Sequence, residues 1–175
     1  MTATITSAKP PASARRSRGA LAAQGPKELS ALPKAFALLG GSRLLKQRPS
    51  NLAEIHAAAV KGLPYSMLFH LTANTKGLAE VDVANVLGVS TRTLRRQKDS
   101  PNKAMPADLG SKTWSLAETM AKAEDVFGSQ DSAERWMMEA AMGLDGARPI
   151  DLMRTMQGTH LVNQFLERLK FGVYQ

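Results

Sequence analysis

The chain has 175 residues, of which 23 are Lys or Arg, 15 are Asp or Glu and none is Cys, and its net charge is +8. This length suits one ordinary domain, or two small helical units with a tail, and it excludes a barrel enzyme. Without cysteine the chain cannot use disulfides, a thiol nucleophile or thiolate metal sites, which fits a cytoplasmic protein. No apolar run approaches the roughly 18 residues of a membrane span, so we expect no membrane segment.

The positive charge is concentrated at the N-terminus. Residues 1–48 contain one acid, Glu28, and nine basic residues: Lys9, Arg15, Arg16, Arg18, Lys27, Lys34, Arg43, Lys46 and Arg48. The first 27 residues, rich in Pro, Gly and small polar side chains, cannot bury enough apolar surface to offset chain entropy. We therefore predict that residues 1–48 form a basic, largely disordered arm, with one short helix between Glu28 and Leu45. A transit peptide is the alternative for the first 25 residues.

Apolar residues recur at helical spacing through the rest of the chain, and strand signals are nearly absent. Ser50 or Asn51 can cap a helix that ends at Gly62, and Pro64 can begin the next one. Most turns carry Gly, which helix ends prefer. The pattern predicts an all-α protein without internal repeats, with helices over residues 52–62, 64–74, 78–87, 91–98, 114–127, 132–142, 149–156 and 159–171.

The stretch from Glu80 to Lys98 has the spacing of a helix-turn-helix. Ala84 is small where two helices approach closely, Gly88 follows at the turn, and Leu94 points inward from the second helix. Ser90 can cap the second helix by accepting a hydrogen bond from a backbone N–H group. The remaining polar and basic side chains of the second helix are left on its exposed side.

A helix of this kind fits the major groove of DNA, where Arg can pair with guanine and Thr can reach base edges. Residues 88–103 carry a local charge of +4, which would attract phosphates whatever the base sequence. The alternative is a helical hairpin with a solvated basic face. We predict a helix-turn-helix domain over residues 49–105 that binds double-stranded operator DNA as a homodimer, since such repressors read two half-sites. Its predicted DNA-binding residues are Ser90, Thr91, Arg92, Thr93, Arg95 and Arg96.

No catalytic, metal-binding or cofactor-binding motif emerges from the sequence. Gly40 to Ser42 lacks the Lys-Ser/Thr of a phosphate loop and is interpreted as a helix end. Glu124 and Asp125 are interpreted as solvated surface acids rather than an acid/base pair. We therefore predict a protein that is not an enzyme and that has no catalytic residue, metal or cofactor. The isolated histidines are His56, His70 and His160. The methionines that could pack a core or, less favoured, form a binding surface are Met137, Met138, Met142, Met153 and Met156.

From about Leu52 to its C-terminus the chain resembles the Xre/MbcA/ParS-like antitoxins that accompany RES-domain toxins. The helix-turn-helix ending in STRTLRR is the first matching block. The more specific series follows: AEDVFG (123–128), AERWM (133–137), ARPIDLMRT (147–155) and GTHLVNQFLERLKFGVY (158–174). In this family the C-terminal block forms a small helical toxin-binding domain whose end docks at the toxin's active site. RES toxins consume NAD⁺, so the resemblance implies an antitoxin that inhibits an NAD-degrading enzyme and represses its own operon.

The last predicted helix has an apolar stripe that can anchor it to its own domain. The stripe consists of Val162, Leu166 and Leu169, with Phe165 beside it. Residues beyond the stripe could then enter a nucleotide cleft of the toxin, although Phe171 and Tyr174 could instead cap the local core. We predict a toxin-binding domain over residues 106–175, with toxin-binding residues Arg154, Lys170, Phe171, Val173 and Tyr174. The rival interpretation is a stand-alone helix-turn-helix transcription regulator whose C-terminal unit dimerises or senses a ligand.

Overall fold

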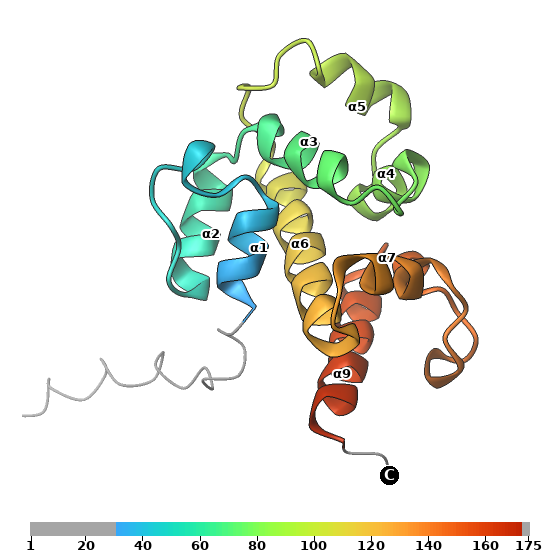
Figure 1. The fold of residues 1–175 in the computed structure, drawn as a ribbon. Helices are drawn as coiled ribbons and strands as arrows, with labels where there is room; N and C mark the ends of the chain where they lie inside the picture. The colour runs from blue at the N-terminus through green and yellow to red at the C-terminus, as the bar shows by residue number, and fades with distance from the viewer. Residues whose placement is uncertain (1–30, 173–175) are drawn as a thin grey trace, which may run out of the picture.

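A computed structural model describes residues 31–172, which form α-helices joined by short turns (Figure 1). Over this range there is no strand, only an isolated bridge between Pro64 and Ala104, so the all-α prediction is confirmed. The helices are α1 (Leu32–Leu38), α2 (Leu52–Lys61), α3 (Tyr65–Asn74), α4 (Glu80–Leu87), α5 (Thr91–Gln97), α6 (Ala107–Phe127), α7 (Gln130–Met138), α8 (Pro149–Leu152) and α9 (Met156–Phe171). Single 3₁₀ turns occur at Gly41–Arg43 and Met142–Leu144.

Helix α6 forms the centre of the fold. Helices α1 and α2 lie on one side of it, α7 and α9 pack around its C-terminal half, and α3 to α5 lie toward its N-terminal end (Figure 1). With 21 residues α6 is about 32 Å long. Its side chains Leu116, Ala117, Met120 and Ala121 are at most 1% exposed. A helix buried over so much of its surface needs neighbours on more than one face, so α6 joins both halves of the chain in one apolar core.

Side-chain caps fix where several helices begin. Asn51 Oδ1 accepts from the backbone N–H of Glu54 at 2.9 Å, while the Glu54 carboxylate accepts from the backbone N–H of Ser50 at 2.7 Å. This reciprocal pairing satisfies donors that a helix N-terminus leaves free. The hydrogen bond from the Ser50 backbone lowers the pKa of Glu54. Ser129 and Thr155 cap α7 and α9 by accepting from the backbone N–H three residues further on.

Helix α6 begins seven residues earlier than predicted, at Ala107. Gly110, which would ordinarily weaken a helix interior, is buried in its first turns and lies against the side chain of Leu63. Thr113, also buried, satisfies its hydroxyl by donating to the carbonyl of Leu109 at 2.8 Å. Packing against the neighbouring α2–α3 connection therefore overrides weak helix propensity in this segment.

The methionines divide between core and surface. Met137 and Met153 are at most 4% exposed, whereas Met142 and Met156 are 92% and 83% exposed. The preferred core interpretation is therefore confirmed for the first pair and wrong for the second. Helix α7 ends before Met142, at Met138, because the chain turns away into the 3₁₀ turn that follows.

The structure confirms the short helix predicted between Glu28 and Leu45, but it shows that residues 31–48 are not a disordered arm. Within residues 31–48, helix α1 packs against α6, and its apolar side chains belong to the core. They recur at three- and four-residue spacing, which places them on one face of a helix. Gly40, with a φ of 96°, follows the helix end as predicted. The buried residues of the segment are Ala31, Leu32, Ala35, Phe36, Leu39 and Pro49 at its border. Predictions for residues 1–30 lie outside the described part of the chain.

Polar contacts join the predicted DNA-binding part to the C-terminal part. Glu134 of α7, only 5% exposed, accepts from the backbone N–H of Gly77 at 2.5 Å. Arg148 Nη2, just before α8, donates to Asp82 of α4 at 3.2 Å. The apolar core is also continuous across the predicted boundary, and α4 packs directly on α6 and α8.

Candidate functional site

Helices α4 and α5 are joined by a three-residue turn from Gly88 to Ser90. Gly88 has a φ of 71°, in the left-handed region that favours glycine. Ser90 Oγ accepts from the backbone N–H of Thr93 at 3.1 Å and so caps α5. Ala84 of α4 and Leu94 of α5 are buried, with 1% and 3% exposure. The two helices and the turn predicted from the sequence are therefore confirmed.

The exposed side of α5 carries two arginines without a carboxylate partner among the described residues. These are Arg92 and Arg96, which line a shallow surface hollow together with Thr93. No hydrogen bond competes for either guanidinium, so both can meet a phosphate or a base edge. Of the six predicted DNA-binding residues, the structure gathers these three.

The other predicted DNA-binding residues are constrained by contacts within the motif. The hydroxyl of Ser90 caps the helix and lies 2.9 Å from that of Thr93, and Thr91, like Thr93, is half-buried. Arg95 Nη2 lies 3.3 Å from Oε2 of Glu80, so this arginine ties α5 back to α4. Lys98 Nζ lies 3.8 Å from the other oxygen of the same carboxylate. The acid that holds them, Glu80, was within the motif but was not singled out by sequence reasoning.

The predicted anchor of the last helix is confirmed at its centre. Val162 and Leu166 of α9 are 0% and 1% exposed. The Phe165 ring stacks on Trp136 of α7, with ring centroids 6.1 Å apart, and the Arg168 guanidinium lies 5.8 Å from the centroid of the same ring. Leu169, the last residue of the predicted stripe, is only half-buried.

Lys170, a predicted toxin contact, is paired within its own chain. Its Nζ lies 3.2 Å from one oxygen of Asp125, and Nζ of Lys34 lies 2.5 Å from the other. Burial raises the pKa of Asp125, but the hydrogen bonds from Lys34 and Lys170 outweigh it, so the net pKa lies below its usual value. The carboxylate therefore joins α1 and α9 to α6. The interpretation of Asp125 as a solvated surface acid is wrong.

The end of α9 stays accessible. Phe171 is 48% exposed, and the helix ends at Gly172, which has a φ of 65°. The predicted toxin contacts Val173 and Tyr174 lie outside the described residues.

Arg154, the remaining predicted toxin contact, ends a chain of ion pairs. Arg154 Nη2 lies 2.6 Å from one oxygen of Asp151, whose other oxygen lies 2.6 Å from Nε of Arg148. Arg148 also forms an ion pair with Asp82. The hydrogen bond from Arg148 to Asp151 is the main cause of the lowered pKa of Asp151. The sequence analysis did not single out Arg148 or Asp82. Asp82 lies on the apolar side of α4, and an acid in that position needs a partner because burying an unpaired charge is costly.

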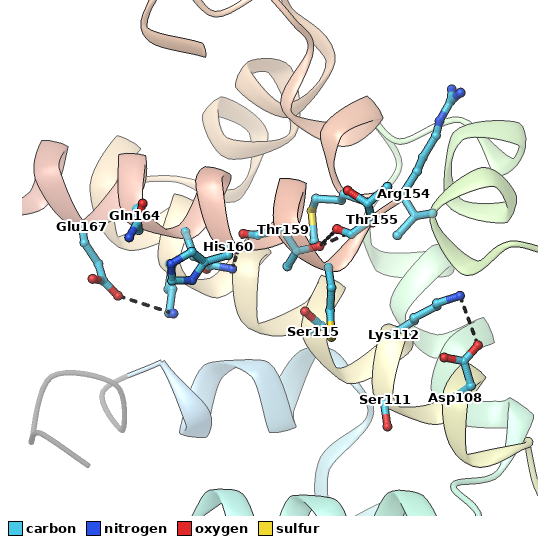
Figure 2. A pocket seen from close by; sticks show the side chains of 15 residues that line it. Asp108, Ser111, Lys112, Ser115, Arg154, Thr155, Thr159, His160, Gln164 and Glu167 are labelled. Atoms are coloured by element: carbon cyan, nitrogen blue, oxygen red, sulfur yellow. Dashed lines mark hydrogen bonds and ion pairs between the residues drawn. The ribbon is translucent and has the colours of Figure 1, made fainter. Parts of the chain in front are cut away.

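A groove of about 550 Å³ lies between α6 and α9 (Figure 2). Arg154 lines one end of it, just before α9, whereas Lys170 lies near the far end of α9, 14 residues after Met156 or about 21 Å along the helix. Among the described residues, the structure therefore does not bring Arg154 and Lys170 together. They mark opposite ends of α9, and the groove follows the helix between them.

The histidines do not form a metal site. Within the range 31–172 no group of three His, Cys, Asp or Glu residues is arranged to hold a metal ion. His56 and His160 are exposed, and Nδ1 of His70 lies 3.0 Å from the carbonyl oxygen of Leu38.

Comparison with known proteins supports the C-terminal helices as a functional unit. Residues 122–172 match the family model described as the antitoxin Xre/MbcA/ParS C-terminal toxin-binding domain. The chain is also similar to a protein named Antitoxin Xre from Pseudomonas putida, with 28% identity over 119 residues that cover 68% of this chain and 72% of that protein. The matched range runs from the last turns of α6 to the end of α9 and so includes Arg154 and Lys170. The chain is therefore similar to the Xre/MbcA/ParS antitoxins, and its residues 122–172 match their C-terminal toxin-binding domain.

Proposed function

We propose that this antitoxin inhibits a RES-domain toxin that degrades NAD⁺, and that residues at and beyond the end of α9 enter the toxin's active site. The observation that carries the proposal is the match of residues 122–172 to a toxin-binding domain. The exposed ring of Phe171, at the end of a helix anchored by Val162 and Leu166, supports it. The exposed end of a fixed helix can reach into a cleft that a flat protein surface cannot enter.

Operon repression through α4 and α5 completes the proposed function. Arg92, Thr93 and Arg96 supply the chemistry for phosphate and base contacts. A homodimer would present two copies of α5 to two half-sites of an operator. We propose that the protein acts in the cytoplasm as a regulator without catalytic activity of its own. No helix among residues 31–172 is long and apolar enough to cross a membrane.

Co-expression with the product of the neighbouring reading frame tests the toxin partnership. We expect a tagged antitoxin to retain a RES-domain protein through affinity purification and size-exclusion chromatography. We expect expression of that protein alone to deplete cellular NAD⁺, and expression of both to restore it. A neighbouring product that neither binds nor depletes NAD⁺ would contradict the proposal and favour the stand-alone transcription regulator.

A further inference from the structure

The groove between α6 and α9 contains polar side chains that the fold does not use. Ser115 of α6 and His160 and Gln164 of α9 line it, and none of the three has a hydrogen-bond or ion-pair partner among residues 31–172. Figure 2 shows these side chains around the space between the two helices. Because Ser115 is half-buried, its hydroxyl has lost part of its access to water. A partner that offers hydrogen-bonding groups would therefore gain more here than on an open surface.

The charged groups of the groove are neutralised within the chain. Lys122 pairs with Glu118 at 3.3 Å and with Glu167 at 3.8 Å, and Lys112 pairs with Asp108 at 3.1 Å. Cations held by their own carboxylates are poor ligands for a phosphate or a nucleic acid. A segment of protein, with amide and hydroxyl groups and some apolar surface, fits this lining better.

An exposed apolar side chain also lines the groove. Met156, in the first turn of α9, is 83% exposed, whereas Met153 just before it is 4% exposed. An exposed methionine beside a buried one offers a flexible apolar contact of the kind that protein interfaces favour. The same end of the groove carries the exposed guanidinium of Arg154.

The size of a stable interface also requires more than the tip of α9. A specific complex covers about 800 Å² on each partner. The exposed face of a 16-residue helix is about 24 Å long and roughly 10 Å wide, a footprint of only about 240 Å². The groove is the adjoining surface, and the family match to a toxin-binding domain includes its α9 wall.

We infer that a segment of the toxin lies in the α6–α9 groove, where it forms hydrogen bonds with Ser115, His160 and Gln164 and covers Met156. This inference rests on the proposed function, because the occupant is the same toxin. It adds a second contact surface along the side of α9, separate from the residues at its end. The toxin would thus hold the antitoxin at two places, one in the groove and one in its own active site.

The test is isothermal titration of the purified RES-domain toxin with the full chain and with the variant His160→Ala/Gln164→Ala. We expect the variant to bind at least tenfold more weakly, which corresponds to about 1.4 kcal/mol. Its melting temperature should not change, because neither side chain has a partner in the fold. The matched control is Gln47→Ala/His56→Ala, which removes the same side-chain types from exposed positions outside the groove and should bind like the original chain.

A second variant, Gln164→Arg, fills the groove rather than emptying it and should weaken binding by at least as much. Equal affinity of the original chain and both groove variants, within twofold, would overturn the groove assignment while leaving the toxin partnership intact. No binding by the original chain would instead contradict the proposed function, and the groove assignment with it.

Discussion

Replacing Glu134 with Ala should weaken the contact between α7 and the α3–α4 turn. The Glu134 carboxylate, on a residue only 5% exposed, accepts from Gly77 N–H at 2.5 Å and from Gln130 Nε2 at 2.6 Å. Hydrogen bonds to a charged group contribute about 1.5–3 kcal/mol each, and the values are not additive. Because the Gly77 N–H is only partly buried, water can replace one partner. We therefore expect the free energy of unfolding to fall by about 2–3 kcal/mol.

Urea denaturation followed by circular dichroism measures this loss of free energy. In a thermal scan, the same loss should lower the melting temperature by about 5–10 °C for a chain of this size. Glu134→Gln keeps an acceptor of the same shape and should recover about half of the loss. Glu139→Ala removes an exposed carboxylate at the end of the same helix and should change stability by less than about 0.5 kcal/mol. If Glu134→Ala were no more destabilising than Glu139→Ala, the contact would not hold the two parts together.

Three further variants test other parts of the structure. Gly158→Ala should cost at least about 2 kcal/mol in urea denaturation, because a Cβ there would lie 1.9 Å from the carbonyl oxygen of Leu152; an unchanged midpoint would contradict this packing. Asp125→Asn should lower the free energy of unfolding at neutral pH. Because the folded-state pKa of Asp125 is lowered, the stability difference between the variant and the original chain should shrink as the pH falls below about 4. A stability difference that persists in acid would exclude the two lysine ion pairs as its cause. Arg92→Ala/Arg96→Ala should weaken operator binding and reduce the slope of log K against log salt by about 2, since each phosphate contact contributes about 0.9; an unchanged slope would contradict the role of α5.

Sequence patterns predicted the elements that depend on neighbours along the chain. The spacing of Ala84, Gly88 and Leu94 indicated two helices around a turn, and the structure buries Ala84 and Leu94 as expected. The cap at Ser90 and the apolar stripe through Val162 and Leu166 were equally local signals. Such features follow from helix periodicity and from the hydrogen bonds that a helix end requires.

Contacts between distant residues were not accessible in the same way. Asp82 and Arg148 are 66 positions apart, and no local pattern pairs them. Lys170 and its partner Asp125 are 45 positions apart, so no local pattern indicates their ion pair either. A short helix was predicted between Glu28 and Leu45, but its place in the core was not, because the basic residues around it suggested an arm, whereas the apolar face of α1 packs against α6.

The most direct test of the central claim is the rate of NAD⁺ loss catalysed by the purified RES-domain toxin as antitoxin is added. We expect the full chain to abolish NAD⁺ loss near a fixed stoichiometry. A chain ending at Gly172 retains every contact described here, so it should fold normally but inhibit at least tenfold less. A full chain that leaves the rate of NAD⁺ loss unchanged at saturating concentration would contradict the claim that this protein neutralises a RES-domain toxin.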